Sequence, residues 1–159
     1  EIIIREFIAS STKKDLVIIT NVEKNKFYNE LLKKTAFDND NRIKFVGTVY
    51  DGELLKKIRE KAFAYIHGHE VGGTNPSLLE ALASTHLNLL LDVSFNYEVG
   101  QNGAMYFNKE IGNLANLIEN LSTLSDEQIG DYANRAKERI DEHYSWKLIV
   151  DKYEQLFLL

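Results

Sequence analysis

The sequence predicts an α/β protein with a doubly wound parallel sheet and helices on both faces. Short apolar runs alternate along the chain with segments of helical periodicity, which is the order that builds parallel sheets from strand–helix–strand units. Most of the short runs are continuously apolar, as strands are when both faces of their sheet are covered. The 159 residues contain no internal repeat, low-complexity tract or linker rich in proline or glycine, so we expect one domain, 1–159.

The first part of the chain predicts a helix, a strand and a second helix. Residues 2–10 have the periodicity of an amphipathic helix. The run "DLVIIT" (15–20) is short, apolar and β-branched, which predicts a buried strand. The next helix is expected over 24–37, because its apolar side chains fall on one stripe: Phe27, Leu31 and Leu32.

The next two elements are a strand and a helix. The segment "RIKFVGTV" (42–49) predicts a strand in which Ile43 and Phe45 share a face and Gly47 interrupts the alternation. The segment "DGELLKKIREKA" (51–62) begins with Asp51, a residue type that favours the N-cap of a helix. The side expected to be buried carries its apolar residues: Leu54, Leu55 and Ile58.

The second half of the chain continues the alternation. The run "AFAYIHG" (62–68) predicts a strand, and Asn75 with Pro76 favours the start of a helix over 76–85. The remaining elements are strands over 87–93 and 103–108, the latter after a turn around Gly100 to Gly103; a helix over 111–122 with Ile111, Leu114, Leu117, Ile118 and Leu121; and a long helix from about 126 to the end, bent near 143–146.

Composition excludes several classes of protein. The net charge is −5 and positive and negative side chains are mixed, whereas a general nucleic-acid binder needs a basic stripe. The sequence has no cysteine, which excludes disulfides and zinc or iron–sulfur sites built on cysteine. No run approaches the roughly 20 apolar residues of a membrane span. The start, "EIIIREFIAS", lacks the basic region and cleavage site of a signal peptide.

The stretch "HGHEVGGTNPSLLEALAS" (67–84) contains the polar residues that are the strongest candidates for binding or catalysis. His67 and His69 are two residues apart with Glu70 beside them, and sets of His and Glu can bind zinc. On an extended segment His67 and His69 share a face while Glu70 points away. A third ligand would have to come from elsewhere, so a metal site is the weaker interpretation.

A phosphate site is the second interpretation of this stretch. Gly72 and Gly73 allow positive φ and let a ligand approach the backbone. Thr74 and Asn75 add donors, and we expect the following helix to present free N–H groups and a positive dipole end. The pattern is neither a P-loop nor G-x-G-x-x-G. A glycine turn that only reverses the chain remains an alternative.

Glu80 favours the phosphate interpretation. It lies in the first turns of the predicted helix, opposite Leu78 and Leu82, and helical side chains lean toward the N-terminus. We therefore expect its carboxylate to point back toward the glycine loop, where it would suit a ribose diol attached to a phosphate. The alternative is an acidic residue that only stabilises the helix dipole.

Three segments of the chain resemble one enzyme family. They are "GGTNPSLLEALA" followed by an apolar strand, "FNYEVGQNGAMYF" (95–107) and "YSWKLIVDKYEQLF" (144–157). They are similar to the donor-binding domain of glycosyltransferase family 4, retaining enzymes of the GT-B fold, and look closest to bacterial rhamnosyltransferase-like members. The resemblance covers nearly the whole chain, and the segment 67–83 is its most specific part.

The resemblance implies half of an enzyme of polysaccharide biosynthesis. GT-B proteins have two Rossmann-like domains with the active site between them. Residues 1–159 would be the C-terminal domain, which binds a nucleotide-sugar donor, as a fragment without its first strand and without the N-terminal acceptor domain. The full-length protein would be active and this fragment alone inactive. The resemblance implies no metal or cofactor, and a cytoplasmic protein for which attachment to the inner membrane face is an alternative.

The resemblance also implies roles for individual residues. Glu80 matches the second glutamate of the family's Glu-x7-Glu motif, which holds the nucleotide ribose. Gly72 stands where that motif has its first glutamate, and Glu70 takes this role toward the donor sugar only if the loop carries two extra residues. The other implied donor contacts are Gly72, Gly73, Thr74, Asn75 and Ser77, and the implied cleft-lining residues are His67, His69, Glu98 and Val99.

Three functions follow as hypotheses. The first is transfer of a hexose or deoxyhexose, with rhamnose as one candidate, from a nucleoside diphosphate to a glycan or lipid-linked acceptor. The second is a non-catalytic α/β module that binds a nucleotide or phosphate. The third is a divalent-metal protein that uses His67 and His69.

Overall fold

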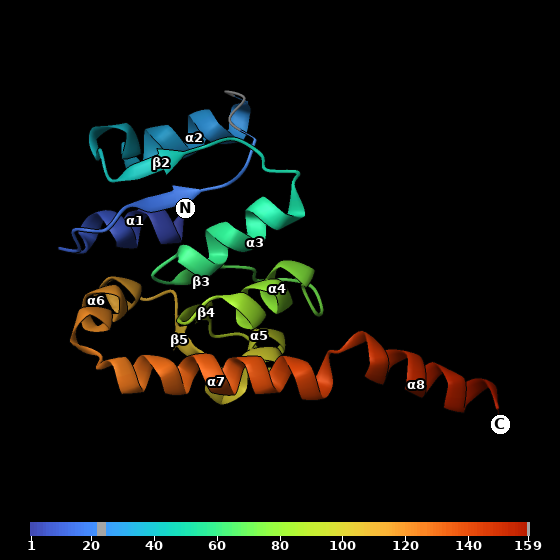
Figure 1. Cartoon of the computed structure of the whole chain (residues 1–159). Helices are drawn as coiled ribbons and strands as arrows, with labels where there is room; N and C mark the ends of the chain where they lie inside the picture. Colours follow the sequence, from blue (N-terminus) through green and yellow to red (C-terminus); the bar gives the residue numbers. More distant parts are fainter. Residues whose placement is uncertain (22–24, 159) are drawn as a thin grey trace. The chain divides into compact units, whose positions relative to one another are not determined.

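The computed structural model describes residues 1–21 and 25–158 (Figure 1). They form two compact units. The first comprises Glu1–Leu55 with Phe107–Leu124, and the second comprises Lys56–Tyr106 with the residues from Ser125 onward. Helix α3 (Gly52–Lys61) and strand β5 (Met105–Phe107) run through the boundaries between these segments. Among the described helices, none is both long enough and apolar enough to cross a membrane.

The first unit is built on two parallel strands. Strand β1 (Leu16–Ile18) pairs with β2 (Ile43–Phe45), with Leu16 opposite Ile43 and Ile18 opposite Phe45. The strands connect to α1 (Ile2–Ala9), α2 (Lys26–Thr35) and the 3-10 helix η1 (Phe37–Asn39). The core contains the buried side chains of these helices and the inward side chains of both strands: Ile4, Leu31, Phe37, Leu16, Ile18, Ile43 and Phe45.

Two charged side chains hold α1 in the first unit. Glu6 is buried, and its Oε2 accepts a 3.4 Å hydrogen bond from the Ala115 amide in the first turn of α6 (Asn113–Asn120). This carboxylate therefore serves the N-terminal end of α6, where orphan N–H groups and the helix dipole favour an anion. Just after the C-terminal end of α1, the carbonyls of Ser10 and Thr12 accept hydrogen bonds from the Arg42 guanidinium at 3.0 and 2.6 Å.

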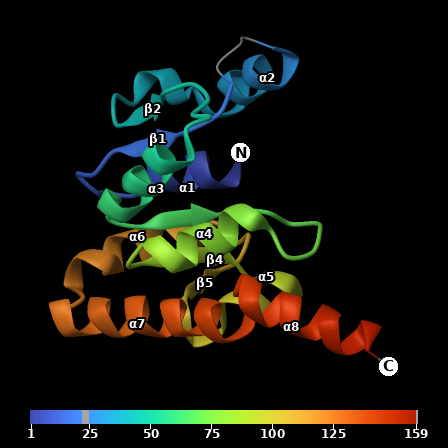
Figure 2. The ribbon, with the colours of Figure 1, turned by 45° about the vertical axis from the view of Figure 1, so that its right-hand side comes forward.

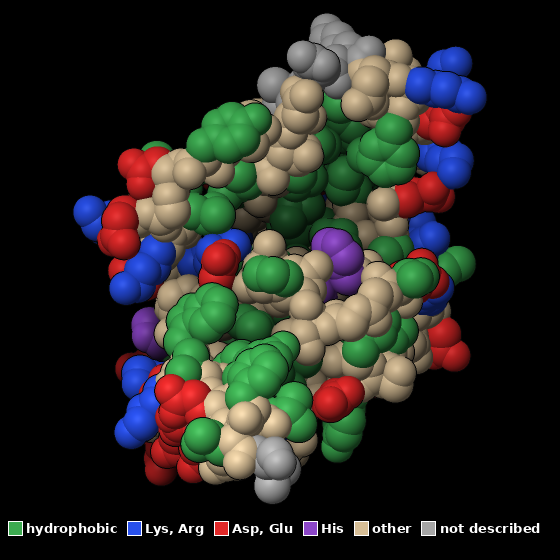
Figure 3. Space-filling view, turned by 90° about the vertical axis from the view of Figure 1, so that its right-hand side faces the viewer, with side chains coloured by type: hydrophobic (Ala, Val, Ile, Leu, Met, Phe, Trp, Pro, Cys, Tyr) green, Lys and Arg blue, Asp and Glu red, His purple; other side chains and the backbone are tan. Residues whose placement is uncertain are grey.

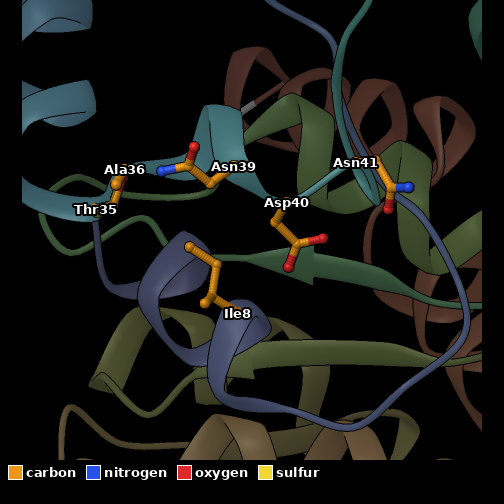
Figure 4. A pocket seen from close by; sticks show the side chains of 6 residues that line it. All are labelled: Ile8, Thr35, Ala36, Asn39, Asp40 and Asn41. Carbon is orange, nitrogen blue, oxygen red and sulfur yellow. The ribbon is translucent and has the colours of Figure 1, made fainter.

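The first unit also carries a surface hollow of about 540 Å³ (Figure 4). Its lining comes from α1, from the end of α2 and from the turn before β2: Ile8, Thr35, Ala36, Asn39, Asp40 and Asn41. The one charged group in this lining is Asp40, whose carboxylate is paired with Arg42 at 2.6 Å. The predicted site residues all belong to the second unit, so this hollow is not their site.

The second unit contains a three-stranded sheet in the order β3-β4-β5. Strand β3 (Tyr65–His67) pairs in parallel with β4 (Asn88–Leu91), with Tyr65 opposite Asn88 and His67 opposite Leu90. All four residues of β4 are buried, as expected for a central strand. The core of the second unit contains Leu78 and Leu82 of α4 (Pro76–Ser84), Val99 of α5 (Ser94–Gly100) and Ala136 of α7 (Asp126–His143). Leu90 of β4 and Ala104, just before β5, complete it.

The last two helices are separated by Tyr144 and Ser145. Ser125 and Gln128 form a capping box at the start of α7, and the Ser145 hydroxyl caps α8 (Trp146–Phe157) through the Leu148 amide. Both ribbon views show α8 continuing past the end of α7 (Figures 1 and 2). Its described residues are all at least partly exposed, and its large exposed apolar side chains include Trp146, Val150, Tyr153, Leu156 and Phe157. Figure 3 shows hydrophobic side chains gathered near this end of the chain.

The predicted α/β class with parallel strands and flanking helices is confirmed. The strands lie in two hydrogen-bonded sheets, whereas the sequence predicted a single one. Every predicted strand contains an observed one, and the predicted helices are present with shorter ends. The predicted residues 24 and 159 lie outside the described part of the chain. The 3-10 helices η2 (Gln101–Gly103) and η3 (Leu121–Thr123) complete the structure.

Three apolar residues predicted on buried helix stripes are exposed instead. Phe27 is 68% exposed because Tyr28 packs against Phe37 and Phe45 in its place. Ile111 is 88% exposed because α6 begins only at Asn113. Leu54 is 48% exposed, and on the same helix the charged Arg59 is buried.

Candidate functional site

The predicted site lies where β3 ends and α4 begins. The chain leaves β3 at His67 and enters α4 at Pro76, and the loop residues from His69 to Thr74 are exposed. Gly72 adopts a φ of +133°, a conformation that favours glycine, and Gly73 lies outside that region. Of the two glycines that allow a positive φ, Gly72 adopts one and Gly73 does not. A Cβ at either glycine would meet open space, so a ligand can approach the backbone of both.

The N-terminal end of α4 differs from the expectation of free N–H groups. Pro76 has no N–H, and the Asn75 side chain accepts the Ser77 amide at 2.9 Å. The Leu78 amide donates to the Asn75 carbonyl at 2.9 Å. The N–H groups that we expected to bind an anion are therefore already hydrogen-bonded to Asn75, the N-cap residue. Among the described residues, the amides of 72–74 form no hydrogen bond, so these loop amides are the donors available to a phosphate.

Glu80 lies on α4 as expected, opposite the buried Leu78 and Leu82. Its Oε2 accepts a 2.6 Å hydrogen bond from Arg59 Nη1. The Arg59 side chain is 11% exposed and the Glu80 side chain 56% exposed. The carboxylate is thus anchored by a buried cation while most of its surface remains accessible to a ligand.

Arg59 is a site residue that the sequence prediction missed. It lies in the last turn of α3, four residues after Leu55, and so falls on the helix face predicted to be apolar. A charged residue on such a face needs a partner when it is buried, and this was the signal that could have identified it. Its carbonyl accepts the Thr85 hydroxyl at 3.2 Å, which ties the end of α3 to the residue that caps α4.

His67 and His69 lie together, as their spacing predicted. Their rings stack with centroids 4.9 Å apart and planes 17° apart, and His67 Nδ1 is hydrogen-bonded to the Tyr65 hydroxyl at 3.1 Å. Burial, with a smaller effect of His69, lowers the pKa of His67 to about 4, so its imidazole is neutral at physiological pH. Within the described residues, no third His, Asp or Glu joins the pair in a group that could hold a metal ion.

Asn96 is a second residue that the prediction missed. Its side chain is fully buried, and its amide donates to the carbonyls of His69 at 3.1 Å and Leu91 at 2.9 Å. One side chain on α5 therefore fixes both the start of the glycine loop and the end of β4. A buried amide that bridges two strand ends rigidifies the edge of the sheet, where α/β proteins bind their ligands.

The two predicted residues on α5 have different surroundings. Glu98 is exposed, and its carbonyl accepts a 2.8 Å hydrogen bond from Arg139 of α7. Val99 is 2% exposed and packs in the core with Leu78 and Leu90. The side chain of Val99 therefore supports the fold and does not line a surface, which corrects the expectation for this residue.

The site thus offers three kinds of group to a ligand. The loop presents the amides of 72–74, which pair with none of the residues that the structure describes, α4 presents the Glu80 carboxylate, and Thr74 and Ser77 add exposed hydroxyls. Glu70 is exposed in the same loop. Amide donors suit an anionic group, and a carboxylate with accessible lone pairs suits hydroxyl donors. A ligand with both a phosphate and a sugar diol matches this combination.

Comparison with known proteins gives matches in structure. The sequence matches no protein-family model and no curated protein. HepE from Anabaena, in a crystal structure with UDP, superposes on 99% of this chain with a TM-score of 0.77 at 15% identity. Sucrose-phosphate synthase from Thermosynechococcus elongatus gives 0.78 over 98% at 16% identity. A glycosyltransferase from Rickettsia africae gives 0.72 over 98% at 14% identity.

These matches assign the fold. The chain covers 44% of HepE, 40% of the synthase and 43% of the Rickettsia protein, which is less than half of each. The chain therefore has the fold of one half of a GT-B glycosyltransferase. A second HepE structure, in complex with UDP and glucose, matches with a TM-score of 0.73.

Proposed function

We propose that this chain is the donor-binding domain of a retaining glycosyltransferase whose donor is a nucleoside-diphosphate sugar. The observation that carries the proposal is the exposed glycine loop at the carboxyl end of β3, followed by α4 with the accessible carboxylate of Glu80. Parallel α/β sheets bind nucleotides at this edge. The likeness to HepE, which is in complex with UDP, supports the choice of ligand.

Each group of the site has a proposed task. The amides of Gly72, Gly73 and Thr74 receive the diphosphate, helped by the Ser77 hydroxyl, and Glu80 accepts hydrogen bonds from the ribose. Asn75 shapes the loop as the cap of α4. We assign Glu70 to the donor sugar, and its exposure in the same loop supports this role. His69 is an exposed polar residue next to Glu70 in the loop, and Glu98 is an exposed polar residue of α5.

The proposed reaction moves a hexose or deoxyhexose, rhamnose among them, to a hydroxyl of a glycan or lipid-linked acceptor. The bond between sugar C1 and the diphosphate oxygen breaks, the acceptor oxygen bonds to C1 on the same face, and the acceptor proton passes to the departing diphosphate. An N-terminal domain of the full-length protein would hold the acceptor. Loop amides stabilise the charge that develops on the diphosphate, so the proposed reaction needs no metal or cofactor.

Calorimetric titration of the full-length protein with UDP- and dTDP-sugars tests the proposal. We expect micromolar to millimolar binding that survives EDTA and that Glu80→Gln weakens. Glutamine retains an acceptor oxygen for Arg59, so this variant changes the charge without stranding the buried guanidinium. Absence of nucleotide binding by the folded wild-type protein contradicts the proposal.

The alternative is a non-catalytic module that binds a nucleotide or phosphate. Gly72 favours it, because it stands eight residues before Glu80, where the resemblance leads one to expect a glutamate. A transfer assay with the full-length protein separates the two functions. Nucleotide binding without sugar transfer to any tested glycan or lipid acceptor favours the module, and transfer of sugar excludes it.

A further inference from the structure

Arg59 and Glu80 form an asymmetric ion pair. Their charged atoms lie 2.6 Å apart, and the arginine side chain is buried while the glutamate side chain is more than half exposed. We infer that Arg59 is a positioning residue that holds the Glu80 carboxylate in the orientation needed to bind the ribose of the donor. This inference rests on the proposed function and names a residue that acts through Glu80 without touching the donor.

The arginine is the fixed member of the pair. It lies in the last turn of α3, where a cation is favoured by the helix dipole, and its carbonyl accepts the Thr85 hydroxyl at 3.2 Å. An exposed glutamate on a helix otherwise samples several rotamers, and ordering it on ligand binding costs conformational entropy. A contact with a buried guanidinium orders the carboxylate before the nucleotide arrives.

The contact leaves the carboxylate with capacity for a ligand. Glu80 Oε2 accepts from Arg59, whereas Oε1 accepts no hydrogen bond from the residues that the structure describes. An ionised carboxylate has about four acceptor positions on its two oxygens. A ribose diol needs two of them, so the pair with Arg59 and the contact with the diol can exist together.

The same ion pair could also serve only as a structural contact, a brace that joins α3 to α4. The effect of Arg59 on different ligands distinguishes this role from the positioning of Glu80. A brace affects every ligand of the site through its stability. A positioning residue for Glu80 affects ligands that carry a ribose and spares inorganic diphosphate, which has none. The two roles also differ in whether the effect of Arg59 depends on the carboxylate of Glu80.

The experiment measures dissociation constants of the full-length protein for UDP or dTDP, whichever binds tighter, and for inorganic diphosphate. The variants are Arg59→Met, Arg59→Lys, Glu80→Gln and the double variant Arg59→Met/Glu80→Gln. Lys57→Met, which removes an exposed cation from the same helix, is the matched control. Thermal unfolding of each variant confirms that it folds, and Arg59→Lys keeps the test decisive where Arg59→Met does not fold.

We expect Arg59→Met to weaken nucleotide binding about tenfold, as for loss of one hydrogen bond to a charged group, and to leave diphosphate binding unchanged. Arg59→Lys should recover part of the loss, Lys57→Met should match the wild type, and the double variant should lose less than the sum of the two single variants. Equal losses for nucleotide and diphosphate, additive losses in the double variant, or wild-type nucleotide binding by Arg59→Met overturn the inference while the proposed function stands. A wild-type protein that binds neither ligand overturns both.

Discussion

The rings of His67 and His69 stack 4.9 Å apart at the end of β3, and the inner ring is also hydrogen-bonded to Tyr65. His67 Nε2 is buried and has no partner among the described residues. Its pKa falls to about 4, first because of burial and then because of the neighbouring His69. A neutral, buried imidazole at the base of an exposed loop makes the stability of this region sensitive to acid.

We expect the free energy of unfolding to decrease as the pH falls from about 6.5 to about 4. In this range the unfolded chain binds a proton at His67 and the folded chain does not, so protonation favours unfolding. A shift of this size corresponds to roughly 3 kcal/mol. Urea unfolding at half-unit pH steps measures the slope. His67→Phe, which keeps a ring for the stack, should flatten it.

His86→Gln is the control for this prediction. His86 is exposed, so its removal should leave the slope unchanged. An unaltered slope in His67→Phe would mean that the acid sensitivity arises at other groups.

Arg42, which directly precedes β2, is expected to stabilise the first unit more than Lys44, the exposed cation of that strand. Its guanidinium pairs with Asp40 at 2.6 Å, donates to the carbonyl groups of Ser10 and Thr12, and lies over the Phe7 ring. Arg42→Met strands these acceptors, and we expect a loss of about 3 kcal/mol in the free energy of unfolding. Chemical unfolding measures it. Lys44→Met removes an exposed pair with Asp15 and should cost less than about 1 kcal/mol.

The ion pair of Arg42 with Asp40 also predicts that the protein loses stability in acid. Hydrogen bonds from Arg42 lower the pKa of Asp40 below its ordinary value near 4. Its stabilising effect is therefore complete above pH 4 and is lost as the pH falls through the lowered value in the folded protein. Asp40→Asn should remove this part of the acid dependence, so the substitution should lower the free energy of unfolding more at pH 7 than at pH 3. An equal cost of the substitution at both pH values contradicts the prediction.

Much of the fold could be predicted because each element carries its own periodic signal. Asp51, Asn75 and Pro76 marked helix starts that the structure confirms. Helix α5 was missed, since it has seven residues and no side-chain cap, and its sequence was assigned to a loop and turn. Short helices of this kind form through tertiary packing, here of Val99 and of Asn96, which no local pattern contains.

The candidate site could be predicted in its location but not in its supporting contacts. The loop and Glu80 are contiguous in sequence and were found together. Arg59 precedes Glu80 by 21 residues, and Asn96 follows His69 by 27, so their contacts depend on the pairing of β3 with β4. The expectation of free N–H groups on α4 failed for a local reason: the Asn75 cap and Pro76 had already removed them.

Gly103 should tolerate no side chain, whereas Gly130 should accept one. A Cβ on Gly103 would lie 2.6 Å from the Cα of Ala136 in α7, and backbone cannot yield as a side chain can. We expect Gly103→Ala to lower the free energy of unfolding by about 2–3 kcal/mol through this overpacking. Gly130 lies inside α7 with open space around it, so Gly130→Ala should raise stability by about 0.5–1 kcal/mol. Thermal and urea unfolding of both variants provide the comparison, and equal effects would contradict it.

Substitution of Gly72 and of Gly73 should distinguish the effect of backbone strain on stability from the effect of ligand contact on nucleotide affinity. Gly72 has a φ of +133° and Gly73 does not, while a Cβ at either position would meet open space. Gly72→Ala should therefore lower the free energy of unfolding by about 1–2 kcal/mol, and Gly73→Ala should change it by less than about 0.5 kcal/mol. Because we propose that both backbones contact the donor diphosphate, both variants should weaken the binding of UDP or dTDP. Calorimetry and urea unfolding on the same samples measure the two effects. Full nucleotide affinity in a folded Gly73→Ala protein would place the diphosphate outside this loop.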